Sequence, residues 1–277
     1  MSDIELAMND GRQKHWLARL YLRHEKKILG TITVVAFITL WELAGSVWTV
    51  VNPIFLSSPS RVLHAGVELY QSGRLLHHLS VSGVEFLLGY SISIVIGVPL
   101  GIALGWYQRF NYAMDPFINA LYAAPVVAFL PLLVIWLGIG LASKLTLIVM
   151  AAVFPILMNA RDAVKTTPNS LLEAARSFQA SQYQIFRTVV LPSAVPFILA
   201  GLRLGAGRAL IGVFVAELYI AQAGIGQMIA EAGSTLNTDV VLVGVVIFAV
   251  VGMTTLELLT QLERRFDKWR PKPGSRT

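Results

Sequence analysis

Six ionisable side chains lie in or beside long apolar stretches of this sequence, and they are the first candidates for chemistry. They are Glu42, Glu85, Arg203, Arg208, Glu217 and Glu257. A charged group in an apolar segment is costly, so it marks either a structural contact or a route for ions and polar solutes. We interpret Glu42 and Glu257 as structural residues near segment ends or against neighbouring helices.

Arg203, Arg208 and Glu217 share one apolar stretch, and their spacing limits how they can act together. On one helix, Arg203 and Arg208 point about 140° apart and cannot form a single binding fork. Glu217 lies about 180° around the helix from Arg208, so these two can pair only across helices or across a dimer axis. Arg203 is close enough to the end of the stretch to extend its charge toward water. The deeper Arg208, together with Glu217, is therefore our candidate for a translocation path.

The residue patterns of an enzyme or a metal protein are missing. The dipeptide Gly-Lys does not occur, so there is no Walker A loop for ATP phosphates. There is no cysteine, which excludes thiolate zinc sites and cysteine nucleophiles. None of the five histidines has metal-ligand spacing, and we interpret the adjacent His77 and His78 as a solvated pair. We expect no catalytic residue, metal or cofactor in this chain.

The composition is that of a membrane protein. The chain is 55% hydrophobic and 14% charged, whereas soluble domains carry roughly a quarter charged residues. Nucleic-acid binding is disfavoured, because no basic stripe interleaved with aromatic residues is present. The first 27 residues are polar and mixed in charge, and no cleavage pattern follows the first apolar run, so this is not a secretory signal.

Six apolar segments are long enough to cross a bilayer, which takes about 20 residues. They cover residues 28–51, 81–106, 115–139, 141–160, 192–220 and 240–262. Between the first two we expect a mixed connector over residues 52–80, with a short amphipathic helix opening at Ser58-Pro59. Residues 221–238 are expected to form a short loop or a re-entrant piece.

Two of these segments carry further signals. The third contains Pro116, Pro125 and Pro131, which predicts a broken helix lining a cavity. The second carries a glycine at every fourth position over residues 97–105. This pattern either lets helix backbones approach closely or reflects the general frequency of glycine in membrane helices.

The polar segment between the fourth and fifth spans predicts two short helices. Ser170 with Glu173, and Ser181 with Gln184, each have the spacing of a capping box, in which the serine accepts an orphan backbone N–H. Pro168 also suits a first helical turn.

The distribution of basic residues orients the chain. Of the 22 Lys and Arg residues, Arg61, Arg74 and Lys144 fall on one side and Arg203 and Arg208 within the fifth span. All the others fall on the side of the N-terminus. The positive-inside rule therefore predicts six spans with both termini cytoplasmic. It also places the two short helices in the cytoplasm, where a soluble partner can dock.

The segment Glu173-Ala174-Ala175, followed at fixed distance by Leu191-Pro192, resembles the EAA loop of binding-protein-dependent ABC importer permeases. The pattern of that family is E-A-A, three residues, glycine, nine residues and I-x-L-P. Here Gln179 stands at the glycine and Val189 at the isoleucine. Four further segments resemble the nitrate/sulfonate/taurine-type branch, and the resemblance covers roughly residues 35–265. They are LSSPSRV, AAPVVAFLPLLVIWLGIG, GLRLGAGRALIGVFVAELY and GIGQMIAEAG.

The resemblance implies an all-α membrane protein with the type I ABC importer permease fold. A cytoplasmic leader (1–27) would precede a six-span domain (28–262) with a coupling loop at 161–191, and a basic cytoplasmic tail (263–277) would follow. The implied partners are a second copy of the chain, a dimer of ATP-binding subunits that hold ATP and Mg, and a periplasmic or lipid-anchored solute-binding protein. The implied location is the bacterial inner membrane.

The resemblance also implies which residues couple the chain to the ATPase. They are Glu173, Ala174, Ala175, Gln179, Ala180, Ser181, Leu191 and Pro192. The alanines would allow close approach, and Glu173 would cap its helix, contact the partner, or do both. Because glutamine disfavours the positive φ that glycine permits, we expect the turn either to stay nearly right-handed at Gln179 or to break at Ala180-Ser181. The capping box at Ser181 favours the second.

The sequence is thus interpreted as an ABC importer permease that forms the path for a small anionic solute, such as nitrate, a sulfonate, taurine, bicarbonate or an aromatic carboxylate. Pro125 and Pro131 are added to Arg208 and Glu217 as candidate path residues. The alternative is a secondary transporter driven by an ion gradient, which would need no ATPase.

Overall fold

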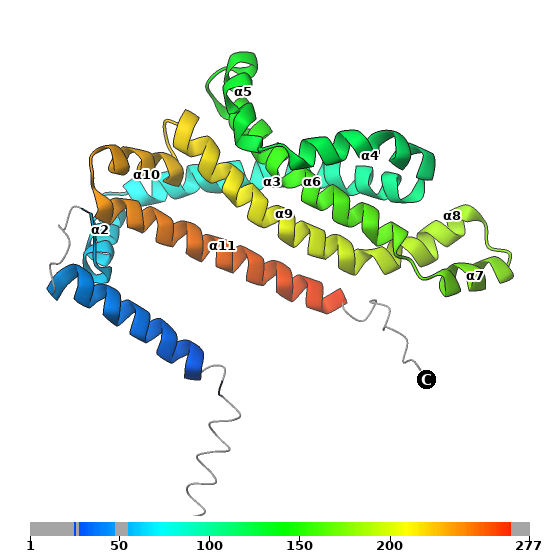
Figure 1. Cartoon of the computed structure of the whole chain (residues 1–277), viewed down its shortest axis with the longest axis horizontal. Coiled ribbons are helices and arrows are strands. Elements are labelled where there is room, and N and C mark those ends of the chain that lie inside the picture. Colours follow the sequence, from blue (N-terminus) through cyan, green and yellow to red (C-terminus); the bar gives the residue numbers. More distant parts are fainter. Residues whose placement is uncertain (1–24, 26–27, 48–54, 267–277) are drawn as a thin grey trace, which may run out of the picture. The chain divides into compact units, whose positions relative to one another are not determined.

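The computed structural model describes residue 25, residues 28–47 and residues 55–266, and every element in them is a helix (Figure 1). The predicted leader over residues 1–27 and the last residues of the predicted tail, 267–277, lie almost entirely outside this range. The chain divides into two compact units, Met1–Ala65 and Gly66–Thr277.

The first unit holds an apolar helix that can span a membrane, Ile28–Ser46. This helix ends in a π-helical turn, η1 (Leu43–Val47). Glu42 accepts hydrogen bonds from the Ser46 hydroxyl (2.7 Å), the Ser60 hydroxyl (2.7 Å) and the Ser60 backbone N–H (2.9 Å). Ser60 is in the first turn of α2 (Pro59–Gln71), so Glu42 caps that helix from a distance. The structural role expected of Glu42 and the short helix expected after Ser58 are both confirmed.

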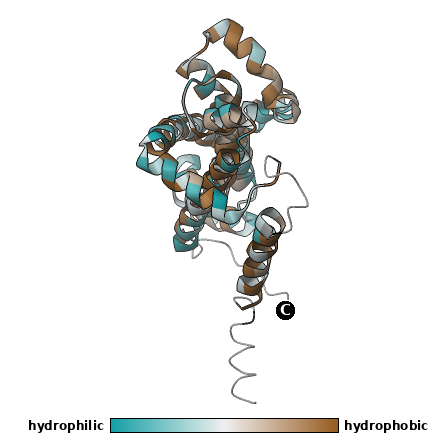
Figure 2. Cartoon of the chain, turned by 90° about the vertical axis from the view of Figure 1, so that its left-hand side faces the viewer, coloured by the Kyte–Doolittle hydropathy of each residue, from teal (hydrophilic) through white to brown (hydrophobic). Residues whose placement is uncertain are grey.

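The second unit contains the remaining helices, including short π- and 3-10-helical pieces. In chain order they are α3 (Arg74–Trp106), α4 (Gln108–Ala123), η2 (Val126–Phe129), α5 (Leu130–Leu137), α6 (Leu141–Lys165), α7 (Asn169–Ser177), α8 (Gln182–Ile185), η3 (Phe186–Val190), α9 (Leu191–Ile220), α10 (Ile225–Ser234) and α11 (Thr238–Phe266). In the described part of the whole chain, five helices are long and apolar enough to cross a membrane, and α4 with η2 and α5 makes a sixth if that bent pair is one span. Figure 2 shows hydrophobic residues along much of the helices, and many large hydrophobic side chains are exposed, as lipid contact requires.

Several span boundaries differ from prediction. The second span begins at Arg74 instead of residue 81, the third at Gln108 instead of 115, and the fourth continues to Lys165 instead of ending at 160. The polar residues at the second and fourth boundaries have partners inside the protein: His78 accepts a backbone hydrogen bond, and Arg161 pairs with Asp115. Such partners let a helix continue through residues that look like loop in the sequence.

The third apolar segment is broken, as predicted. α4 and the η2–α5 pair meet at an angle of 90°. Ala124, which precedes Pro125, is extended (φ −68°, ψ 137°), because a proline disfavours helical geometry in the residue before it. Pro131 lies in the first turn of α5, where its missing N–H costs nothing.

Helix α6 is the centre of the second unit, packed between α3 and α9 (Figure 1). Ile148 and Ile156 of α6 are completely buried. A Cβ added to Gly89 or Gly97 of α3 would press on Ile148 or Ile156, respectively. Glycines of α9 contact the same two isoleucines from the other side: Gly212 lies against Ile148, and Gly205 against Ile156.

Close backbone approach therefore explains the glycines of α3. At Gly101 and Gly105, an added Cβ would meet the backbone carbonyls of Leu157 and Arg161 as well as side chains of α6. Of the two readings of the glycine spacing, the packing interpretation is confirmed.

We predict opposite effects of alanine at two glycines of α3. Gly89→Ala should destabilise the protein by about 1–3 kcal/mol, because its methyl group overlaps Ile148 in a filled core. Gly83→Ala should stabilise it by up to about 1 kcal/mol, since that position has nothing within 4 Å and alanine favours the helix. Thermal unfolding in detergent, followed by tryptophan fluorescence, measures both, and equal shifts in the two variants would contradict the packing.

Candidate functional site

The segment predicted to dock a partner forms a helical hairpin between α6 and α9. Its helices α7 and α8 rest on a small apolar cluster in which Ala163, Val164, Ile185, Val190 and Ala194 are buried. Ala175, like Leu172 and Ala180, packs against this cluster. The hairpin is therefore attached to the ends of two long helices through its apolar side.

One of the two predicted capping boxes is present. Ser181 accepts the Gln184 N–H at 3.3 Å, and the Gln184 side chain accepts the Ser181 N–H at 2.7 Å. The box predicted at Ser170 is wrong: α7 is preceded by Pro168 as N-cap, with no side-chain cap bond. The Pro168 carbonyl accepts the first helical bonds, so Ser170 lies inside the helix and cannot cap it.

The turn between the two helices is made by Gln179 itself, with φ +55°. The Gln179 N–H donates to the Arg176 carbonyl (2.8 Å) and the Ala180 N–H to the Ala175 carbonyl (3.1 Å). These two bonds define a Schellman motif, whose left-handed residue is usually glycine. Both turns expected from the sequence are therefore wrong, because the pair of C-terminal hydrogen bonds outweighs the steric cost of a side chain at this position.

Leu191 and Pro192 stand where the hairpin enters the long helix α9. The five residues before them form the π-helical turn η3, and Pro192 lies in the first turn of α9. A proline lacks the N–H and crowds the carbonyl four residues earlier, and a wider π turn is one way to accommodate it. The Leu-Pro pair thus marks the point where the π-helical turn passes into the regular helix α9.

The tip of the hairpin presents both acidic and apolar groups outward. Glu173 and Ala174 are exposed, and Phe178 is 87% exposed. Among the residues that the structure describes, the Glu173 carboxylate has no hydrogen-bond or ion-pair partner, and it caps no helix.

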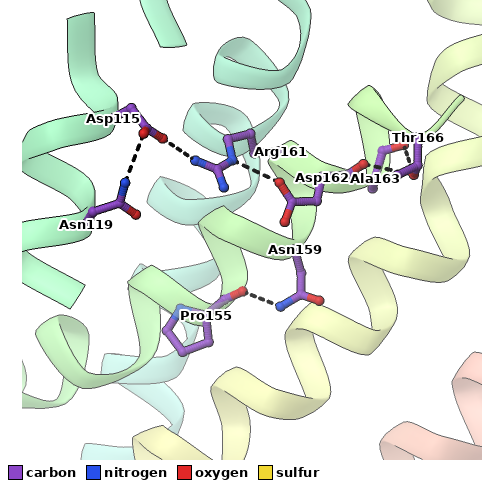
Figure 3. Close-up of polar contacts among 8 residues, drawn as sticks. All are labelled: Asp115, Asn119, Pro155, Asn159, Arg161, Asp162, Ala163 and Thr166. Carbon is purple, nitrogen blue, oxygen red and sulfur yellow. Dashed lines mark hydrogen bonds and ion pairs between the residues drawn. The ribbon is translucent and has the colours of Figure 1, made fainter. Parts of the chain in front are cut away.

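The end of α6 is tied to α4 just before the hairpin begins. Figure 3 shows the Arg161 guanidinium between two carboxylates: Nη1 is 2.8 Å from Asp115 of α4, and Nε is 3.0 Å from Asp162. Asn119 donates a further hydrogen bond to Asp115 (2.9 Å). A displacement of α6 at this end must therefore carry α4 with it or break this ion pair, in which Arg161 is mostly buried and Asp115 is 42% exposed.

The structure separates the three charged candidates of α9. Arg203 is held by α11, with Nη1 3.5 Å from Glu263 and 3.5 Å from the Thr260 hydroxyl. Arg208 is exposed and, within the described residues, has no hydrogen-bond or ion-pair partner. Glu217 is 1% exposed and accepts a hydrogen bond from Ser82 of α3. Arg208 and Glu217 therefore do not meet in this chain.

Arg208 lies on an exposed face of α9 that also carries apolar and aromatic side chains. Leu204, Ile211 and Tyr219 are exposed and share this face by helical spacing. The prolines proposed as path residues, Pro125 and Pro131, are also exposed.

The sequence named Glu85 as a candidate, but it did not reveal the buried polar contacts in the first half of α3. Glu85 forms a buried ion pair with Lys144 of α6, and His78 is buried where a solvated residue was predicted. His78, Ser82 and Glu85 recur at intervals of four and three residues, which puts them on one face of a helix. This periodicity was the available signal.

Comparisons with known proteins agree with this fold and hairpin. Residues 97–268 match the family described as binding-protein-dependent transport system inner membrane component. The chain is 37% identical to the taurine transport system permease protein TauC of Escherichia coli K12, over 87% of this chain and 88% of that protein. It is 34% identical to the putative aliphatic sulfonates transport permease protein SsuC of Bacillus subtilis 168, over 87% of each. The chain thus belongs to this family of ABC importer permeases, in its taurine/sulfonate branch.

A solved relative supports the architecture. The MetNI methionine ABC transporter in inward-facing conformations aligns with a TM-score of 0.59 and 20% identity, covering 67% of this chain and 92% of that chain. The type I importer permease fold expected from the sequence is confirmed.

We predict that glycine has opposite effects at Gln179 and at Gln182. Gln179→Gly should stabilise the protein by up to about 1 kcal/mol, because glycine adopts the left-handed conformation without the strain of a Cβ. Gln182→Gly, three residues later in the right-handed helix α8, should destabilise it by about 1 kcal/mol. Thermal unfolding of the two variants measures this, and a loss of stability in both would show that Gln179 is held by its side chain.

Proposed function

We propose that this chain is the permease of an ATP-driven importer for small sulfonate-like anions, coupled to a separate ATPase through the α7–α8 hairpin. The observation that carries the coupling role is the hairpin itself: an exposed tip with Glu173 and Phe178, attached to the spans through a buried underside. Family membership and the absence of a phosphate-binding loop in the sequence support an external source of energy.

In this mechanism the hairpin sits in a groove on a cytoplasmic ATP-binding subunit, which supplies ATP and Mg. Two copies of the chain surround one path, and a solute-binding protein delivers the solute from outside. The distribution of Lys and Arg supports cytoplasmic termini, and the bacterial relatives support a location in the inner membrane. When the two ATPase subunits close, the hairpins move together and carry α6 and α9 with them.

The substrate class is supported by Arg208. An unpaired guanidinium on a span is costly in lipid, so this face of α9 suits a water-filled path between two copies. A guanidinium binds tetrahedral oxyanions through paired, charge-assisted hydrogen bonds. The exposed Leu204 and Ile211 beside it suit a short alkyl chain. Taurine and aliphatic sulfonates, after which the two relatives are named, have this combination of groups.

We predict that Glu173→Lys and Ala175→Trp uncouple the transporter. Lysine reverses the exposed charge, and tryptophan forces α7 away from its apolar cluster. In proteoliposomes containing the assembled complex, ATP-driven uptake should fall at least tenfold while the permease remains in the membrane. Glu231→Gln, which removes an exposed charge on α10 that lies 4.0 Å from Arg74 of α3, is the control and should transport normally. Normal uptake in both hairpin variants would contradict the coupling role.

Arg208 is the candidate path residue to be tested, and Arg203 on the same helix is its control. Arg208→Gln should reduce uptake of taurine and alkanesulfonates by roughly 10–100-fold, the loss expected from a charge-assisted hydrogen bond of about 1.5–3 kcal/mol. Arg208→Lys, which keeps the charge without the paired donors, should lie between wild type and Arg208→Gln. Arg203→Gln should lower stability without changing the half-saturation concentration for the solute, because its contacts are with α11. Equal transport defects in Arg203→Gln and Arg208→Gln would show that Arg208 is not a solute contact.

A further inference from the structure

The short helix α10 begins at a site built by side chains from two other helices. It follows α9 after a short loop, and its own N-cap residue is Gly224, which has no side chain. The first N–H groups of a helix have no partner within the helix. In this chain, three consecutive N–H groups are satisfied from outside.

Each of the three acceptors is a different side chain. The Gly224 N–H donates to Nδ1 of His78 (3.1 Å), the Ile225 N–H to the Ser82 hydroxyl (2.9 Å), and the Gly226 N–H to the Glu217 carboxylate (2.7 Å). His78 and Ser82 belong to α3, and Glu217 belongs to α9.

Glu217 of α9 also bonds Ser82, one of the two α3 side chains that hold α10. The Ser82 hydroxyl, which accepts the Ile225 N–H, donates its own proton to the other carboxylate oxygen of Glu217 (2.6 Å). A carboxylate at a helix N-terminus is also favoured by the aligned peptide dipoles. One carboxyl group therefore holds α10 directly and holds the hydroxyl that anchors the preceding residue of α10.

The backbone around Glu217 is shaped to its side chain. Gly224 has φ +127°, and a Cβ on it would overlap the Glu217 carboxylate. A Cβ on Gly226 would lie 2.7 Å from the Glu217 Cβ and 2.8 Å from the Phe214 carbonyl. Both glycines therefore let the chain close around the carboxylate.

Apolar contacts also attach α10 to the rest of the unit. Ile225, Met228, Ile229 and Ala232 are buried, so one side of α10 is part of the protein interior. Figure 1 shows α10 beside α9 and α3 at the same end of the second unit. On the same face of α3, Glu85 adds the ion pair to Lys144 of α6.

We propose that Glu217 is a positioning residue, which fixes α10 to α3 and α9 so that the three helices move as one body during transport. α10 is then a fixed part of this end of the path and not a lid that opens by itself. Because α9 runs from the hairpin to this end of the unit, its displacement carries α10 and α3 with it. This last consequence rests on the proposed function, whereas the anchoring does not.

Hydrogen exchange tests the anchoring without any transport assay. In Glu217→Gln, the amide group of glutamine offers one acceptor oxygen and one NH₂ group, so either Ser82 or Gly226 loses its acceptor. Exchange of the backbone amides at residues 224–226 should become about tenfold faster or more, as expected when a buried hydrogen bond is lost.

Ser82→Ala, which retains the carboxylate, should raise exchange at the same amides, and it serves if Glu217→Gln does not fold. Ser234→Ala, which removes a hydroxyl that bonds the Glu231 carbonyl within α10 itself, should leave exchange at these amides unchanged. Wild-type exchange in both Glu217→Gln and Ser82→Ala would overturn the proposal.

A chemical cross-link tests whether α10 moves with α3. The chain has no cysteine, so Arg74→Cys with Glu231→Cys places one thiol on α3 and one on α10. Both side chains are more than half exposed, and the 4.0 Å ion pair between them, which the double substitution replaces, shows that the two positions are close enough to be joined. A short, cleavable bifunctional thiol reagent should join them without loss of ATP-driven uptake, because the proposal requires no movement between the two helices. Loss of uptake that returns when the reagent is cleaved would overturn it.

Restoring uptake with the cross-link distinguishes a positioning role of Glu217 from a general structural role and from contact with the solute. In Glu217→Gln, uptake should fall, and the same cross-link should restore at least half of it by holding α10 on α3. A folded Glu217→Gln variant whose uptake the cross-link leaves reduced would show that Glu217 acts otherwise. If the wild-type complex shows no ATP-driven uptake, the proposed function fails, while the exchange comparison still decides the anchoring.

Discussion

The second unit depends on the close approach of α6 to the two helices on either side of it. Ile148 and Ile156 are each pressed between a glycine of α3 and a glycine of α9. In lipid there is no hydrophobic drive to bring helices together, so dispersion contacts at short range must provide much of the packing energy. Glycine permits that range, and each larger residue at these points would separate two helices. The three helices consequently behave as a tightly packed group into which the polar elements are fitted.

Several of the charged residues within the helices form ion pairs with another helix. Arg161 reaches Asp115, Glu85 reaches Lys144, and Arg203 reaches Glu263. Each pair joins two different helices, which is how an intramembrane charge is usually accommodated. Arg208 differs because it has no such contact among the described residues. That difference, and not the presence of arginine as such, is why we assign the solute to this face.

The sequence predicted correctly those structural features that depend on residues close together in the chain. The box at Ser181, the break at Pro125 and the start of a long helix at Pro192 are set by neighbouring residues, and the structure has them within a residue or two. Prediction failed where two local signals competed. At Ser170 the preceding proline starts the helix first, and at Gln179 a pair of hydrogen bonds stabilises a conformation that glutamine ordinarily avoids.

Long-range pairings lay outside what spacing can predict. Ser82 and Glu217 are 135 residues apart, and His78 and Gly224 are 146 apart. Nothing in either stretch identifies the other as its partner. The sequence marked Glu217 as unusual because of its charge, but only the fold shows that its carboxylate faces the start of α10. The same holds for the ends of α3 and α6, where distant partners allow the helices to extend through polar residues.

The most direct test of the account is the energy source for uptake. The permease should be purified together with its ATPase subunit, reconstituted with the solute-binding protein, and supplied with radiolabelled taurine or an alkanesulfonate. We predict uptake that requires ATP on the side of the α7–α8 hairpin and that persists when proton and sodium gradients are abolished. Uptake by this chain alone, driven by either gradient and indifferent to ATP, would contradict the account.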